Sequence, residues 1–199
     1  MEIPYTVEAH PETGLNNGKI GIWLFLTSEV MLFGALFATF IMLRIGSDGE
    51  WAHMQAEAEL NIPLATINTA VLIASSLTMV MAWASLVRGQ LNKFRLFGWL
   101  TVGCGAIFLV IKYFEYTAKF AHDHFPSSNT YLAIYFTMTG LHALHVIGGM
   151  AWNAYFTGPG SKLFHTNRQW LTDRVEHSGL FWHFVDLVWI FLFPVFYLL

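Results

Sequence analysis

The sequence predicts an all-α membrane protein, a polytopic bundle of five transmembrane helices in a single domain that covers residues 1–199. Hydrophobic residues make up 55% of the chain and charged residues only 12%, whereas a soluble domain is about 25% charged. Five apolar runs reach the length of about 20 residues that a helix needs to cross a bilayer. The polar segments between them are short, which leaves too little sequence for a separate soluble domain.

The five expected helices follow one another with short connections. They lie roughly at residues 19–43, 65–87, 96–119, 130–156 and 177–199. After the first run, Gly46-Ser47-Asp48-Gly49 is a turn signal, and the acidic stretch from Trp51 to Glu59 favours a short surface helix. A tight basic loop at 88–95 and a polar loop at 122–129 separate the next runs. Thr157-Gly158-Pro159-Gly160 ends the fourth run.

The basic residues predict the orientation of the bundle. One side would hold Lys19, Arg88, Lys93, Arg95, Lys162, Arg168 and Arg174. The other side would hold only Arg44 and Lys119, with Lys112 nearer that end. Because Lys and Arg accumulate in cytoplasmic loops, we expect the N-terminus in the cytoplasm and the C-terminus outside. The net charge of −3 and the lack of a basic cluster give no indication of nucleic-acid binding.

Ionisable side chains inside the apolar runs are the candidate functional residues. An ionised group near the bilayer centre costs roughly 2.5–3.5 kcal/mol on insertion scales, so each needs a partner. At about 1.5 Å of rise per residue, Glu29, His145, His183 and Asp186 lie about 10–16 Å from the predicted cytoplasmic side. We expect these four, together with His142 one turn from His145, to form a polar packing layer near the middle of the membrane. Depth alone leaves their pairing open.

A second, outer polar layer is expected closer to the other surface. Lys112 and Glu115 lie one turn apart on one helix face, which allows a local ion pair. Asn68 enters its helix from the same side and would join them.

The residues allow several kinds of chemistry. Glu29 could carry protons, as in a proton channel, or could be a neutral or paired carboxylate that fixes helix packing. His142 and His145, with His183 across the bundle, could ligate haem in a membrane cytochrome. The glutamate of an HExxH zinc motif is missing, and there is no phosphate loop, CxxC or nucleophile with a nearby base. The residues favour a membrane subunit with no catalytic, cofactor or metal site of its own.

Motifs in all five runs resemble subunit III of haem–copper oxidases, in its five-helix bacterial version. The motifs are Trp23-Leu-Phe-Leu-Thr-Ser-Glu29, Pro63-Leu-Ala-Thr-Ile-Asn68-Thr69, Glu115-Tyr116, Thr139-Gly140-Leu-His142-Ala-Leu-His145 and Trp182-His183-Phe184-Val185-Asp186. The sequence departs from the family at Lys112, where glutamine is common, and at Ala143, where glycine is common.

The resemblance implies a non-redox accessory subunit of a proton-pumping respiratory oxidase that reduces oxygen to water. Subunit I would carry the haems and one copper, subunit II would usually receive the electrons, and this chain would contain neither haem nor copper. It would pack on subunit I beside subunit II and small subunits in the bacterial inner membrane. It would also bind phospholipid and support proton uptake and active-site integrity, with Glu29 as the family's carbodiimide-reactive carboxylate. Subunit III of a quinol oxidase and an accessory protein of a nitric oxide reductase are the nearest alternatives.

Overall fold

The computed structural model describes residues 17–58 and 60–198, and within them every regular element is helical. The helices are α1 (Asn17–Ile45), α2 (Trp51–Glu57), α3 (Ile62–Val87), α4 (Leu91–Ala121), α5 (Thr130–Thr157), η1 (Pro159–Lys162), α6 (Leu163–Thr166) and α7 (Arg168–Tyr197). Five of them, α1, α3, α4, α5 and α7, are long and apolar enough to cross a membrane. The predicted all-α bundle of five spans is confirmed.

The largest difference from the predicted boundaries is the start of α7. The apolar run begins at residue 177, but the helix begins at Arg168. Asn167 caps it, since its side-chain oxygen accepts a hydrogen bond of 3.0 Å from the Trp170 backbone N–H. The first turns carry Asp173, Arg174 and Glu176. These charges lower the hydropathy without disturbing backbone hydrogen bonding, so the helix extends beyond its apolar part.

Four of the long helices form a compact unit. Helix α3 packs along α4 and α7, and α5 packs along the same two helices from the other side. Trp182 of α7 lies at the centre, with no exposed surface. It fits there because a Cβ atom on Gly105 or on Gly149 would come within 2.9 Å or 2.8 Å of its ring. Its indole N–H donates to Ser75 Oγ at 3.0 Å.

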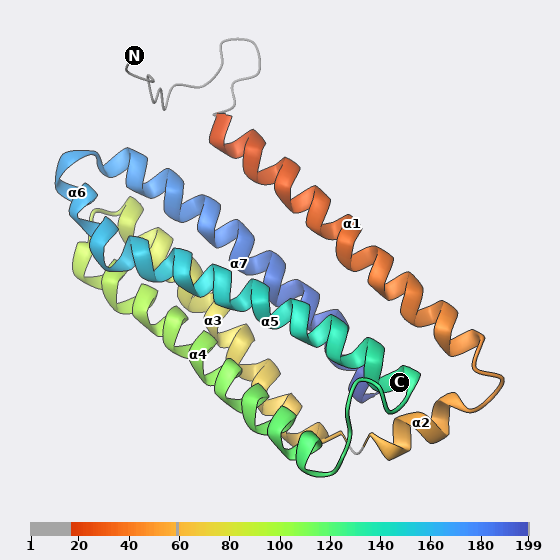
Figure 1. The fold of residues 1–199 in the computed structure, drawn as a ribbon. Helices are drawn as coiled ribbons and strands as arrows, with labels where there is room; N and C mark the ends of the chain where they lie inside the picture. Colours follow the sequence, from red (N-terminus) through yellow and green to blue (C-terminus); the bar gives the residue numbers. More distant parts are fainter. Residues whose placement is uncertain (1–16, 59, 199) are drawn as a thin grey trace.

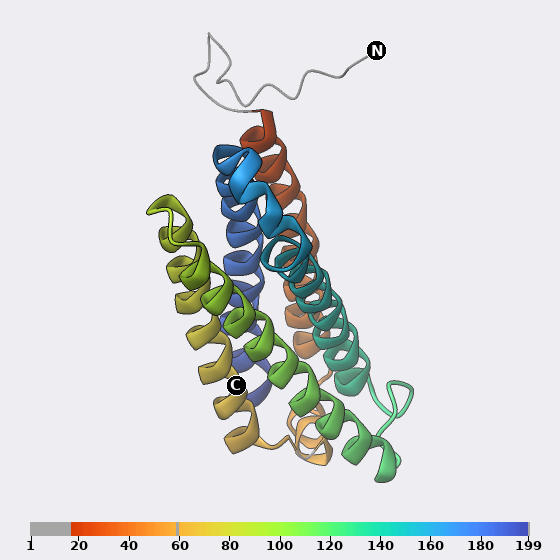
Figure 2. The same cartoon turned by 90° about the vertical axis from the view of Figure 1, so that its left-hand side faces the viewer.

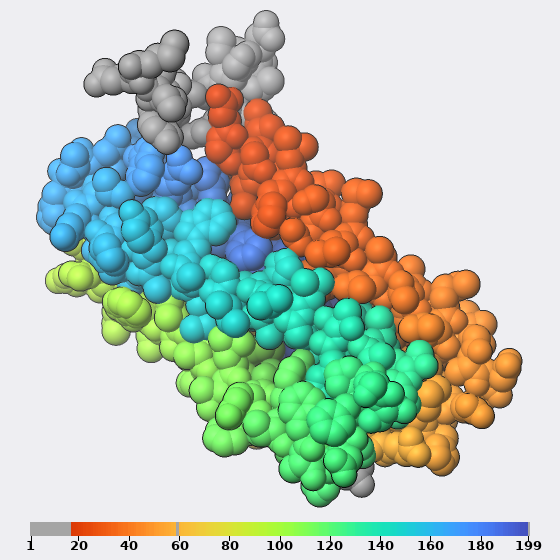
Figure 3. All heavy atoms as spheres, viewed as in Figure 1, coloured from red at the N-terminus to blue at the C-terminus, as the bar shows by residue number. Residues whose placement is uncertain are grey.

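Helix α1 lies outside this four-helix unit, against α7 and α5 (Figures 1 and 2). Only 17% of its most apolar window is buried, against 50% for α7. At its N-terminal end Lys19 pairs with Glu176 at 2.7 Å. In the space-filling view α1 crosses the surface as a separate ridge (Figure 3). The packing of α1 within the chain is therefore the loosest of the five spans.

The short helix α2 joins α1 to α3 and anchors the far end of α1. Its Trp51 is only 5% exposed. The Trp51 ring meets Phe40 of α1 edge-on at 5.1 Å and Tyr131 of α5 at 5.3 Å. The short helix expected after the first span is present, and it contributes a buried tryptophan to the core.

Candidate functional site

Glu29 of α1 and His145 of α5 form a pair in the middle of their helices. The distance from Glu29 Oε2 to His145 Nε2 is 2.9 Å, and the two side chains are 15% and 14% exposed. His145 Nδ1 lies 2.8 Å from the carbonyl oxygen of Leu141. A carbonyl oxygen can only accept, so Nδ1 carries a hydrogen.

The hydrogen-bond roles at His145 determine what this pair can do. With Nδ1 protonated, the bond between Nε2 and the carboxyl group needs one further proton. That proton resides either on Glu29, as a neutral acid beside a neutral imidazole, or on His145, as a carboxylate beside an imidazolium. Both forms have zero net charge, which suits a low-dielectric setting. The pair can therefore shift one proton between α1 and α5 without a change of total charge.

His183 and Asp186 lie elsewhere, where α7 faces α3. The distance from His183 Nδ1 to Ser76 Oγ is 2.6 Å. Asp186 is 4% exposed, and neither carboxyl oxygen has a hydrogen-bond partner among the described residues. The ionisable residues expected in one layer are thus divided between an α1–α5 pair and an α3–α7 cluster.

His142 is a packing residue in this structure. It has no exposed surface, its ring stacks on Trp189 at 5.2 Å, and it meets Phe108 edge-on at 5.5 Å. Neither ring nitrogen has a hydrogen-bond partner within the described chain.

Lys112 and Glu115 of α4 form a buried ion pair of 2.9 Å, with each side chain 5% exposed. Lys112 Nζ also donates to Tyr197 Oη at 2.7 Å. The hydroxyls of Tyr135 and Tyr197 donate to Glu115 Oε1 at 2.8 and 2.5 Å. Asn68 does not join this cluster. Its side-chain nitrogen lies 3.5 Å from the Phe108 carbonyl oxygen.

Sequence reasoning missed the partners that come from distant segments. Tyr197 lies near the end of its apolar run, yet its side chain faces the inside of the bundle. It is 4% exposed and completes the Glu115 cluster. The sequence did not indicate Ser76 as the partner of His183, although the two side chains are hydrogen-bonded. The sequence indicated only that further partners must exist, because a buried charge needs more hydrogen bonds than one neighbour can supply.

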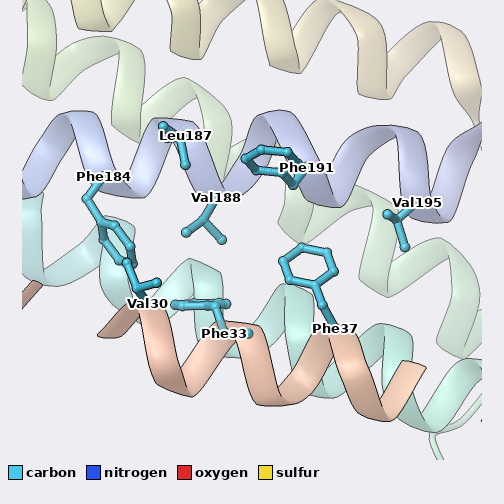
Figure 4. Close-up of a pocket in the computed structure, with 9 residues that line it drawn as sticks. Val30, Phe33, Phe37, Phe184, Leu187, Val188, Phe191 and Val195 are labelled. Carbon is cyan, nitrogen blue, oxygen red and sulfur yellow. The ribbon is translucent and has the colours of Figure 1, made fainter. Parts of the chain in front are cut away.

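Two hollows flank α1. The first is an apolar groove of about 310 Å³ between α1 and α7, into which Phe33, Phe37, Phe184 and Val188 project (Figure 4). The second, of about 330 Å³, lies near the N-terminal end of α1 and is lined by Gly21, Phe25, Trp152, Arg174 and His177. An apolar groove and a hollow with a basic rim are suited to lipid chains and to a polar head group, respectively.

No group of three or more His, Cys, Asp or Glu side chains among residues 17–58 and 60–198 could hold a metal ion. The absence of haem and copper from this chain stays a prediction.

The fold and these contacts define a class of protein, a multi-pass helical membrane protein with a hydrogen-bonded glutamate–histidine pair between two of its spans. The sequence pattern of the family described as cytochrome c oxidase subunit III matches residues 6–199. The chain belongs to this family, and is therefore a subunit III of the haem–copper oxidases.

The similarity to individual relatives extends along most of each chain. The cytochrome c oxidase subunit 3 of Thermostichus vulcanus is 34% identical over 90% of this chain and 86% of its own. That of Bacillus subtilis is 32% identical over 98% and 93%. The cytochrome bo(3) ubiquinol oxidase subunit 3 of Pseudomonas putida is 31% identical over 90% and 84%.

Proposed function

We propose that this chain is a non-redox accessory subunit of a proton-pumping terminal oxidase that reduces oxygen to water. Family membership places it in an oxidase complex with partner subunits. The observation that carries the accessory role is the Glu29–His145 pair, a proton-sharing site inside the membrane with no metal-ligand group around it among the described residues. The haems and copper then belong to subunit I and its neighbours.

We also propose where the chain lies and how it is oriented in the membrane. The chain spans a bacterial inner membrane with its N-terminus in the cytoplasm. The basic residues support this, since Lys19 in the first turn of α1 lies at the same end of the bundle as Arg88 after α3 and Arg168 at the start of α7. Positively charged loops stay on the cytoplasmic side.

The proposed contribution to the complex is phospholipid binding and support of proton uptake. Glu29 is partly exposed, and Val30 and Phe33, just after it in α1, line the apolar groove. A bound acyl chain in this groove would stabilise α1 against α7, because α1 has few contacts of its own. The proton between Glu29 and His145 could pass to a group of the partner subunit that lies beside this pair.

The assignment is tested by purification of the tagged chain from membranes. We expect a larger haem-bearing subunit to co-purify, and we expect the chain, once separated, to have no haem absorption. A Soret band in the separated chain would identify it as a membrane cytochrome instead. Proton flux through the isolated chain in liposomes would favour a proton channel.

The role of Glu29 is tested with Glu29→Gln in the whole complex. The amide still hydrogen-bonds but cannot share a proton, so we expect normal assembly and faster loss of activity during turnover. Glu57→Gln on α2 is the control, since Glu57 is exposed and its contact is with His53 of the same helix. An inactivation rate unchanged from that of the control would show that Glu29 is only structural.

A second candidate is subunit III of a quinol oxidase, favoured by the 31% identity to the Pseudomonas putida protein. The purified complex would then oxidise a quinol and not cytochrome c. Assay of both donors with the same preparation decides between the two.

A further inference from the structure

His183 presents a hydrogen-bonding atom at the surface of this chain, in the middle of the membrane-spanning part. It lies near the centre of α7, which runs from Arg168 to Tyr197. Its Nδ1 binds Ser76 of α3, while Nε2 has no partner among the described residues and is not enclosed by them. The ring is only half-buried.

The surroundings of His183 are an apolar surface made by two helices. We call it the His183 face and define it as Ile73, Ser76 and Val80 of α3 with His183, Leu187 and Ile190 of α7. These positions share a helix side with Ser76 or His183 because they lie three, four or seven residues away. Ile73, Val80, Leu187 and Ile190 are 46–53% exposed. The face adjoins the α1–α7 groove, which Leu187 also lines.

Lipid is a poor covering for this face. A polar group in contact with hydrocarbon costs free energy unless it finds a hydrogen-bond partner. Exposed hydroxyls elsewhere satisfy this rule within their own helices. For example, Thr39 donates to Ala35 O and Thr137 donates to Ala133 O, each at 2.8 Å. An imidazole nitrogen that points away from its helix has no such local acceptor.

We propose that the His183 face docks a transmembrane helix of the haem-bearing partner subunit, and that this helix places a hydrogen-bonding side chain against His183 Nε2. This inference rests on the proposed function, from which the partner subunit follows. It adds the surface of this chain that contacts the partner. Ser76 holds the imidazole in place through its hydrogen bond with Nδ1. Polar side chains in lipid associate in this way across helices.

Photo-crosslinking in the intact, membrane-embedded complex tests the location. A photoreactive amino acid replaces Ile73 or Ile190 on the His183 face, and Ile107 of α4 or Leu144 of α5 as matched controls at similar depth. All four side chains are 49–64% exposed. We expect adducts with the haem-bearing subunit from the first two positions and not from the controls.

Each other result overturns the proposal in a distinct way. Adducts with lipid alone from Ile73 and Ile190 would show that lipid covers the face. Adducts with a second copy of this chain would show a homodimer. Adducts with the haem-bearing subunit from Ile107 or Leu144 alone would place the interface elsewhere and leave the proposed function intact. If no haem-bearing subunit co-purifies at all, the proposed function itself fails.

A second measurement isolates the hydrogen bond. We expect His183→Phe to reduce retention of the chain in the detergent-solubilised complex about 3- to 10-fold, as one interhelical hydrogen bond in a membrane would. His183→Gln, which keeps a donor and an acceptor, should restore most of it. Equal retention of His183→Phe and wild type, with both folded, would contradict a polar contact at this position.

Discussion

Two carboxylates inside the membrane-spanning part of this chain have very different surroundings. Glu115 of α4 accepts hydrogen bonds from Lys112, Tyr135 and Tyr197, and its side chain is 5% exposed. Glu29 of α1 has one hydrogen-bonding partner within the described residues, His145, and its side chain is 15% exposed. Glu115 belongs to the four-helix unit, whereas Glu29 lies on the loosely packed helix.

We propose that this difference separates a structural role for Glu115 from a functional role for Glu29. A carboxylate with an ammonium group and two tyrosine hydroxyls around it is held as a fixed charge, and it ties α4 to α5 and α7. The Glu29–His145 pair is joined by one hydrogen bond between α1 and α5, and both side chains are partly exposed. Replacement of the first carboxylate should damage assembly, and replacement of the second should alter behaviour during turnover.

The largest effect is expected for Lys112→Leu. This change leaves Glu115 buried without its counter-charge, which destabilises a protein by about 3–5 kcal/mol. We expect a strong drop in the amount of chain recovered in the complex, measured by quantitative immunoblotting of membranes.

The double variant Lys112→Leu with Glu115→Leu serves as its control. It removes both charges, and a well-packed apolar pair is often as stable as a buried ion pair. Recovery should therefore exceed that of the single variant. A double variant as poor as the single one would mean that the charge itself is not the cause.

Tyr197→Phe should have a smaller effect on the same cluster. It removes one hydroxyl that donates to Glu115, and a hydrogen bond to a charged group contributes about 1.5–3 kcal/mol. Thermal unfolding of the complex in detergent should show a lower midpoint for this subunit. Tyr113→Phe on the exposed side of α4 is the control, since the Tyr113 side chain is 66% exposed.

His145→Leu is expected to destabilise the chain less than Lys112→Leu does. Glu29 is less buried than Glu115, so the loss is that of one interhelical hydrogen bond, about 1–2 kcal/mol at most. The loss of stability is measured as the change in resistance of the complex to dissociation in detergent. A loss as large as that of Lys112→Leu would remove the distinction between the two sites.

The smallest effect is expected for Lys19→Gln. The Lys19–Glu176 pair is 39% and 29% exposed, and surface ion pairs contribute about 0–1 kcal/mol. Any loss of stability should shrink further at high salt, because exposed charges are screened. Lys93→Gln, at the start of α4, provides the matched control.

The sequence was informative where the signal is local. Long apolar runs predicted the five spans, and spacing along one helix predicted that Lys112 and Glu115 could meet. It failed where charged residues continue a helix beyond its apolar part, as at the start of α7. Counting residues gives the depth of Glu29, His145, His183 and Asp186 but not the side of the helix each partner occupies. For that reason the pairs Glu29–His145 and Ser76–His183 required the arrangement of the helices.

The contrast between the two carboxylates is tested most directly by lipid and subunit content in purified complexes that carry Glu29→Gln or Glu115→Gln. Phospholipid and this chain are each measured per haem. We predict that Glu115→Gln lowers the amount of chain, with lipid falling in proportion. Glu29→Gln should keep the full amount of chain and lose lipid per chain. If both variants lower the chain equally, or if Glu29→Gln keeps its full lipid content, the division of roles proposed here is wrong.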